Sequence, residues 1–175
     1  MTSTRWSTRP ETRHDIAAIR AVELAAFPTE FEADLVDALR ADPQVWIDGL
    51  SIVSENDEGR IVGHALFTRC QVDDAPVLTL APCAVLPDYQ GRGVGSAAIR
   101  TGLEAARRLG ENLVVVLGHP AYYPRFGFTP ASGYGVLATF DAPDEALMAL
   151  ALDPARPTPR GVIRFPAAFG DLGTL

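Results

Sequence analysis

The stretch that decides the fold is residues 78–96, which reads LTLAPCAVLPDYQGRGVGS. Its first half is a continuous apolar run with β-branched residues, a pattern typical of a strand buried on both faces. Its second half is a glycine-rich turn that opens directly into a helix, predicted over residues 96–109 and capped by Gly110. The first N–H groups of a helix are unpaired and lie at the positive end of its dipole. This turn therefore predicts a phosphate site built from backbone alone.

Three known kinds of turn place glycines before a helix in this way. A P-loop requires a lysine, and the chain contains none. A dinucleotide-binding turn requires a third glycine, where Ala98 stands, and an acid after the next strand, whereas Glu111 precedes that strand. The third kind is Gln/Arg-x-x-Gly-x-Gly/Ala, which Gln90, Gly93 and Gly95 satisfy. It resembles the pyrophosphate loop of the GNAT superfamily of acyl-CoA-dependent N-acyltransferases, and a plain strand-to-helix turn is the alternative.

A second motif follows the predicted helix. Residues 112–117 form the most strand-like run of the chain, and a right-handed crossover would place them parallel to the central strand. Beyond them, Tyr123, Gly127 and Phe128 hold the spacing Tyr-x-x-x-Gly-Phe. This spacing is similar to that of GNAT enzymes, in which the tyrosine faces the thioester sulfur. Taken alone, Tyr123 would suit a core aromatic with a hydrogen-bonded hydroxyl, but two motifs flanking one crossover favour the GNAT interpretation.

The other predicted elements occur in the order of the GNAT fold. They are a strand at residues 5–9, a helix at 13–27 that opens with a capping box of Thr12 and Asp15, a helix at 31–40, a hairpin of 50–54 with 61–67, a closing strand at 146–152 and an edge strand or tail at 161–165. The resemblance implies an α/β fold with a mixed central β-sheet flanked by helices on both faces. We expect residues 1–175 to form a single N-acetyltransferase domain, because this length suits one sizeable core.

Composition and charge narrow the class of protein. The chain has a formal net charge of −7, with fifteen arginines and no lysine, so we expect it to repel nucleic acid and to suit a cationic amine. No apolar run is long enough to span a membrane and the polar first residues lack a signal-peptide core, so we expect a cytoplasmic protein without a membrane partner. Cys70 and Cys83 are expected to be buried reduced thiols, too few for a cysteine-based zinc site.

The resemblance implies acetyl-CoA as the co-substrate and no metal. In the family the pantetheine arm pairs with strand backbone between two diverging parallel strands, and the matching residues here are Cys83, Ala84 and Val85. An amide there would also polarise the thioester carbonyl. Pro82 lacks an amide, which predicts a bulge beside the slot. The pyrophosphate is expected on Gln90, Gly91, Arg92, Gly93, Val94, Gly95 and Ser96, with Arg92 either adding charge or remaining solvated.

The reaction implied by the resemblance is direct attack of a primary amine on the thioester through a tetrahedral intermediate. Tyr123 is expected to protonate the leaving thiolate, and Tyr122, about 100° away around a short helix, is the competing donor. The sequence departs from better-defined members of the family, because neither central strand contains a carboxylate. The candidates for the general base are therefore His119, Glu30, Glu32 or a water chain to bulk solvent.

Several alternatives stay open from the sequence. The missing strand carboxylate leaves room for a non-catalytic acyl-CoA-binding or regulatory module. The acceptor amine is either a small molecule or a peptide, and the apolar C-terminal tail is compatible with a homodimer. His14 is expected at a solvated helix position and His64 on a strand facing a neighbour, and neither is given a role.

Overall fold

A mixed β-sheet organises the chain in the computed structural model, which describes residues 6–170. The hydrogen-bonded order within these residues is β1-β2-β3-β4-β5-β8-β6, and β9 pairs with the far end of β3 and with β7. Two pairs are parallel, β4 with β5 and β7 with β9, and the others are antiparallel. The strands are β1 (Ser7–Pro10), β2 (Ser51–Glu55), β3 (Ile61–Val72), β4 (Ala75–Val85), β5 (Leu113–Leu117), β6 (Thr129–Pro130), β7 (Val136–Leu137), β8 (Leu147–Ala151) and β9 (Gly161–Arg164).

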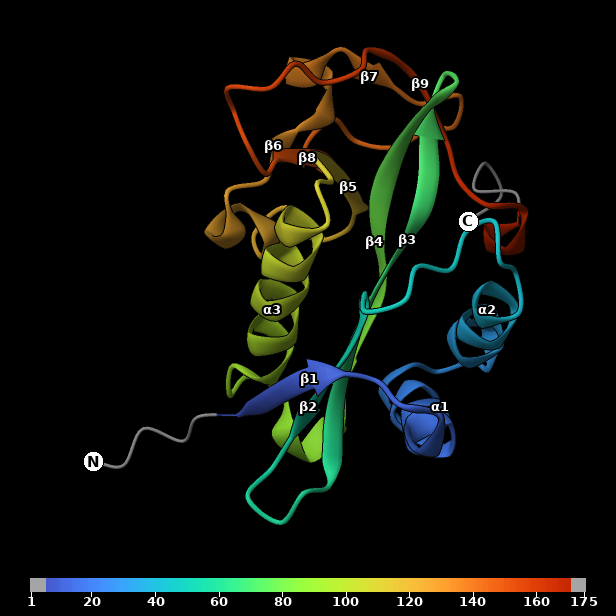
Figure 1. Ribbon diagram of the computed structural model, residues 1–175, viewed down its shortest axis with the longest axis vertical. Helices are drawn as coiled ribbons and strands as arrows, with labels where there is room; N and C mark the ends of the chain where they lie inside the picture. Colours follow the sequence, from blue (N-terminus) through green and yellow to red (C-terminus); the bar gives the residue numbers. More distant parts are fainter. Residues whose placement is uncertain (1–5, 171–175) are drawn as a thin grey trace.

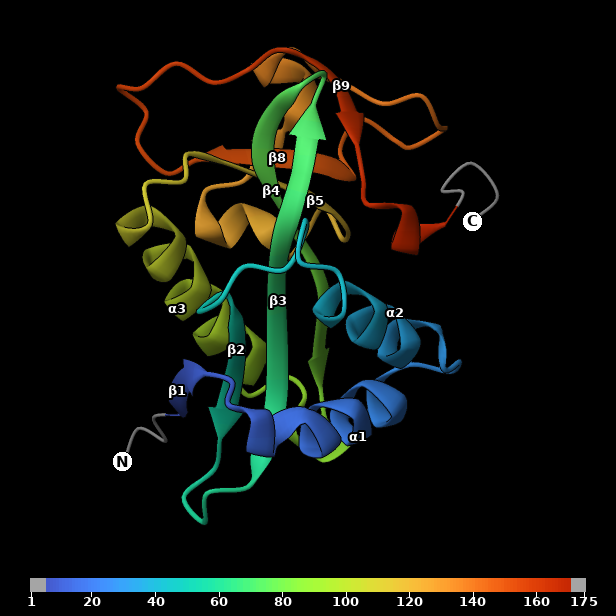
Figure 2. The same cartoon turned by 45° about the vertical axis from the view of Figure 1, so that its right-hand side comes forward.

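Helices cover both faces of the sheet. Figures 1 and 2 show α3 (Val94–Arg108) on one face, and α1 (Ile16–Ala26) and α2 (Phe31–Arg40) together on the other. The expected α/β arrangement, a mixed sheet flanked by helices on both faces, is therefore confirmed. Residues 6–170 also contain five short 3-10 helices: η1 (Arg13–Asp15), η2 (Pro87–Tyr89), η3 (Tyr123–Phe126), η4 (Ala131–Tyr134) and η5 (Ala167–Phe169).

Apolar layers hold the helices against the sheet. On the α3 face, Ile99 and Leu103 pack in one buried cluster with Leu80 and the aromatic ring of Phe67. Gly102 allows this close approach, because a Cβ built there would lie 2.1 Å from Cε2 of Phe67. A second cluster joins α1 and α2 to the opposite face of β2, β3 and β4. Both faces of the central strands are therefore buried, as their continuous apolar sequence predicts.

The parallel pair at the centre of the sheet is short. Only Leu78 with Val114 and Thr79 with Val115 pair across β4 and β5, although β4 continues to Val85. From Leu80 onward, β4 keeps its antiparallel pairing with β3 but has no hydrogen-bonded neighbour on the β5 side. The two strands therefore diverge toward the carboxyl end of β4 and leave an open slot between them.

The bulge predicted at Pro82 is confirmed. The register between β3 and β4 shifts between Ala65 and Phe67, so that Ala65 faces Cys83 while Phe67 faces Leu80. Two residues of β4 therefore stand opposite one residue of β3. Pro82 is one of them, and it has no N–H to donate to the ladder.

The capping box of Thr12 and Asp15 is confirmed, but η1 forms the turn that follows it, so α1 begins only at Ile16. The first strand includes Pro10, and the start of its predicted range, Arg5, lies outside the described residues. The strand predicted at residues 61–67 continues to residue 72, and the two-residue strands β6 and β7 were not predicted. The third helix begins two residues before its predicted start, because Gly93, with φ of +84°, serves as the N-cap. None of the helices within residues 6–170 is both long and apolar enough to cross a membrane.

Candidate active site

The glycine turn presents an uncovered backbone surface at the start of α3. Gly91 and Gly93 have φ angles of +75° and +84°, a left-handed conformation that residues with a Cβ rarely adopt. A Cβ built at either position would meet no atom within 4 Å, so the space above these two residues is open. Among residues 6–170, no side chain caps the N-terminus of α3, so its first amides are free to bind an external acceptor. This is the geometry that suits a phosphate group.

Side chains fix the turn in place from both sides. The amide nitrogen Nε2 of Gln90 donates to the carbonyl oxygen of Val85 at 3.0 Å and ties the turn to the end of β4. The indole of Trp6 donates to the carbonyl oxygen of Arg92 at 2.9 Å. The guanidinium of Arg92 lies 5.3 Å from the ring centre of Trp6 and 5.2 Å from that of Tyr89, so it is held by aromatic faces on the surface of the turn.

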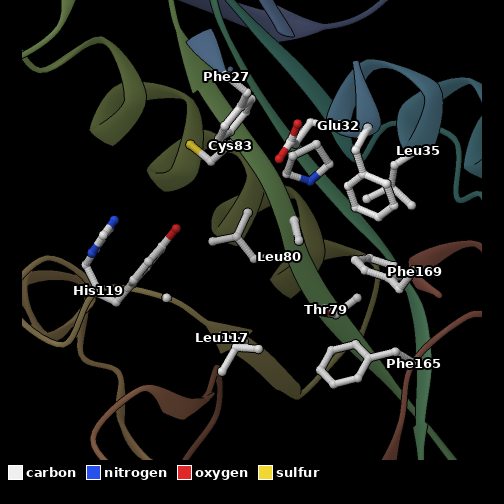
Figure 3. A pocket seen from close by; sticks show the side chains of 15 residues that line it. Phe27, Glu32, Leu35, Thr79, Leu80, Cys83, Leu117, His119, Phe165 and Phe169 are labelled. Atoms are coloured by element: carbon white, nitrogen blue, oxygen red, sulfur yellow. The ribbon is translucent and has the colours of Figure 1, made fainter. Parts of the chain in front are cut away.

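Two cavities meet at the slot between β4 and β5. The turn cavity, of about 460 Å³, is bordered by the end of β4, the glycine turn and the start of α3. The apolar cavity, of about 320 Å³, lies between the α1–α2 junction, β4, the end of β5 and residues 165–169. Cys83, His119 and Tyr123 border both cavities. Figure 3 shows Cys83 and His119 near one end of the apolar cavity, with Phe165 and Phe169 near the other.

Most residues predicted to bind the cofactor are brought together in this arrangement. The buried side chain of Ala84 instead packs toward the α1 and α2 face, and the exposed Arg92 stacks on Trp6 and Tyr89. The strand backbone at Ala84 still forms part of the β4 edge that has no β5 partner. Eight of the predicted residues border the turn cavity: Cys83, Val85, Gln90, Gly91, Gly93, Val94, Gly95 and Ser96.

The two neighbouring tyrosines occupy different positions. The hydroxyl of Tyr122 lies 3.0 Å from the hydroxyl of Ser96, and its ring carries the guanidinium of Arg125 at 4.3 Å. Tyr122 borders only the turn cavity, whereas Tyr123 borders both. Burial raises the pKa of Tyr123 well above its ordinary value, and the nearby Cys83 and Tyr122 add to the rise. Tyr123 is therefore a neutral phenol at physiological pH and keeps a proton to donate.

The structure distinguishes the candidates for the general base by whether they border the apolar cavity. Glu32, half-buried on α2, and His119, exposed after β5, both border the apolar cavity. Glu30 is exposed and does not border it.

Burial raises the pKa of Cys83 to about 12, so its thiol is protonated and acts as a small neutral wall of the slot.

His64 is buried in a polar chain that the sequence did not reveal. Its two ring nitrogens lie 2.7 Å from a carboxylate oxygen of Glu23 and 2.8 Å from the hydroxyl of Ser51. Burial raises the pKa of Glu23, while the hydrogen bond from His64 opposes the rise. His14 is exposed, as expected.

The sequence did not point to the aromatic walls of the apolar cavity. Phe27 and Phe31 flank the Pro28 break between α1 and α2, and Phe165 and Phe169 come from the C-terminal segment. The one available signal was the density of phenylalanine beside prolines in these two segments. This density of phenylalanine does not indicate that residues 27–31 and 165–169, more than 130 residues apart in the sequence, lie side by side. Only the folded structure brings the two segments together.

Comparison with known proteins decides the family. The family model described as Acetyltransferase (GNAT) family matches residues 15–128, which run from the capping box to the Tyr-x-x-x-Gly-Phe motif. The chain belongs to the GNAT acetyltransferase family. The GNAT superfamily, its fold and the acetyltransferase class predicted from the sequence are thereby confirmed.

GNAT relatives and structures resemble this chain over most of its length. It is 46% identical over 138 residues to the uncharacterized N-acetyltransferase YjhQ of Escherichia coli K12, which covers 76% of this chain and 75% of YjhQ. The crystal structure of the E. coli GNAT family N-acetyltransferase YhbS in complex with CoA superposes with a TM-score of 0.86 at 27% identity, over 99% of this chain and 96% of that one. A Brucella melitensis GNAT acetyltransferase in complex with acetyl-CoA gives a TM-score of 0.76 at 33% identity, over 95% and 99%.

Proposed function

We propose that the protein transfers an acetyl group from acetyl-CoA to a primary amine at the junction of the two cavities. The observation that carries this proposal is that Cys83, His119 and Tyr123 border both cavities, which supports one cavity for the thioester of the cofactor and the other for the amine. Two similar proteins were crystallised with CoA and with acetyl-CoA, which supports the same co-substrate here.

The cofactor is assigned to the turn cavity. Its pyrophosphate accepts hydrogen bonds from the amides of the turn between Gln90 and Ser96, where the dipole of α3 favours negative charge. Its pantetheine arm pairs with the β4 backbone at Cys83, Ala84 and Val85. These residues pair with β3 on one side, and β5 does not pair with them on the other. The thioester then lies at the slot, where a β4 amide polarises its carbonyl oxygen.

The chemistry follows from the groups around the slot. The neutral amine attacks the thioester carbonyl carbon, a C–N bond forms, and the tetrahedral intermediate collapses with cleavage of the C–S bond. Tyr123 donates its proton to the departing thiolate, and the nitrogen loses its extra proton to Glu32 or His119, directly or through water. The products are the acetylated amine and CoA as a thiol.

The test is release of CoA thiol with a panel of primary amines, measured against hydrolysis without amine. Saturable thiol release that depends on amine, with the acetylated amine identified by mass spectrometry, is the expected result. The Glu32→Gln and His119→Ala variants then identify the base, because its loss lowers kcat/KM for the amine while the Kd for CoA stays the same. CoA binding without amine-dependent release from any panel member would instead establish a non-catalytic binding module.

A further inference from the structure

The apolar cavity has a composition that restricts the acceptor. Aromatic rings form much of its wall, from Phe27 and Phe31 on one side and Phe165 and Phe169 on the other. Figure 3 shows three of these rings, Phe27, Phe165 and Phe169, together with Leu80 and Leu117. Phe31 and Leu117 are 42% and 37% exposed, so apolar side chains extend to the mouth of the cavity. A ligand body that fills this space exchanges water for hydrocarbon and aromatic contacts.

Among the described residues, one carboxylate and no guanidinium border the cavity. Glu32 is the one carboxylate among the described residues that border it. No arginine borders it among residues 6–170, and the chain contains no lysine. A single ammonium group therefore finds a counter-charge in Glu32, whereas a second ammonium would be desolvated without one, and a carboxylate or a phosphate on the ligand would meet no arginine or lysine.

Among the described residues that border the cavity, β4 contributes the hydroxyl of Thr79 and the segment after β5 contributes the imidazole of His119. The hydroxyl of Thr79 is buried and has no hydrogen-bond partner among the described residues, and Thr79 borders the cavity beside Leu80. His119 borders both cavities, and Figure 3 shows it across the apolar cavity from Phe165 and Phe169. The cavity is thus bordered by a hydroxyl and an imidazole on its strand side, and by aromatic rings from the α1–α2 junction and the C-terminal segment. Its volume of about 320 Å³ is at the lower end of the range for small-molecule sites.

We propose that the acceptor is a small primary monoamine with an aromatic or aliphatic body and no acidic group. The inference rests on the proposed function, because it assigns the apolar cavity to the amine. The ammonium group pairs with Glu32 before it loses its proton, and the body lies among the phenylalanines. Amino acids, polyamines, aminoglycosides and phosphorylated amines are poor ligands for this cavity on the same grounds.

Matched pairs of amines test this directly. 2-Phenylethylamine and phenylalanine share a ring and an amine and differ by one carboxylate, while hexylamine and spermidine differ in the number of ammonium groups. We expect kcat/KM to be about 100-fold or more higher for 2-phenylethylamine than for phenylalanine, because the carboxylate is buried without a partner. Hexylamine should likewise exceed spermidine. Equal or reversed preferences, or a preference for a peptide over 2-phenylethylamine, would overturn the inference and leave the acetyltransferase function standing.

A binding measurement separates the two proposals. Calorimetric titration of the same amines into the CoA-bound protein reports occupancy of the cavity without turnover. Tighter binding of 2-phenylethylamine than of phenylalanine supports the inference even if no amine is acetylated. Absence of acetylation would contradict the proposed function but not the inference about the cavity. Tighter binding of phenylalanine or spermidine contradicts the inference whatever the turnover.

An engineered charge provides a second test. Leu117→Arg places a guanidinium at the mouth of the cavity, where the side chain is already partly exposed. The ratio of kcat/KM for phenylalanine to that for 2-phenylethylamine should rise by about tenfold, which corresponds to one new ion pair of about 1.4 kcal/mol. Leu109→Arg is the matched control, because Leu109 is 55% exposed at the end of α3 and borders neither cavity. An equal rise in the control, or no rise in Leu117→Arg, contradicts the assignment of the apolar cavity to the amine.

Discussion

At the scale of single residues, the position of Tyr123 between the two cavities carries the proposed chemistry. Tyr123→Phe removes the proton donor while the ring and its contacts with Tyr122 and Phe128 remain. We expect kcat to fall by about 100-fold or more, since general acid catalysis typically contributes this much, with little change in the Kd for CoA. Tyr122→Phe is the control, because its hydroxyl contacts Ser96 and borders only the turn cavity. A larger loss of kcat in Tyr122→Phe would reverse the assignment of the acid.

Asp15 makes a second residue-scale prediction, for stability. It accepts hydrogen bonds from Arg9 at 2.7 and 3.0 Å and from the Thr12 amide at 2.7 Å. The hydrogen bonds from Arg9, followed by those from Thr12, lower the pKa of Asp15 from 3.8 to about 2, although burial opposes the shift. The charged form therefore stabilises the fold above pH 3.8, and this contribution is lost as the pH falls through 3.8 toward 2.

The size of this contribution is at most about 2 kcal/mol, reduced by the partial exposure of Arg9. Asp15→Asn should lower the free energy of unfolding by about 1–2 kcal/mol at neutral pH, since it breaks both the ion pair and the capping box. Urea titrations at pH 7 and at low pH measure the difference. It should shrink as the pH approaches 2, and a difference that is independent of pH would contradict the linkage.

At the scale of elements, the contact of α3 with β3 depends on Gly102. Gly102→Ala would gain about 0.5–1 kcal/mol from helix propensity. Its Cβ, however, would lie 2.1 Å from the ring of Phe67, which is fully buried in the core, so the ring or the helix would have to shift. We expect a net loss of about 1–3 kcal/mol in the free energy of unfolding. Gly133→Ala is the matched control because a Cβ there meets no atom within 4 Å, and equal effects at both sites would contradict this packing.

The elements also show what the sequence could and could not predict. The turn at Gly91 and Gly93 could be predicted from the sequence, because its left-handed backbone requires glycines at a fixed spacing before the helix. The slot could be predicted in part, because Pro82 has no N–H group and interrupts the hydrogen-bond ladder between β3 and β4. The series of hydrogen bonds from Glu23 through His64 to Ser51 could not be predicted. Those side chains meet only when α1 lies across β2 and β3. The aromatic walls of the apolar cavity were hidden for the same reason, as they depend on tertiary packing rather than on a local pattern.

At the scale of the whole molecule, one sheet connects all three buried clusters, so we propose that the chain is a single domain. Thermal or urea unfolding should then follow one cooperative transition. Circular dichroism reports the whole sheet, and fluorescence reports Trp6 at the glycine turn and Trp46 near α2. The two probes should give the same midpoint. Two separated midpoints would indicate that the N-terminal and C-terminal parts unfold independently.

The central claim is that CoA binds where the glycine turn begins α3 and lies along the slot between β4 and β5. Calorimetric titration of the folded protein with CoA tests it most directly. The account predicts saturable binding of one CoA per chain, weakened when a CoA fragment without the diphosphate is used instead. Absence of saturable heat from a protein that circular dichroism shows to be folded would contradict the account.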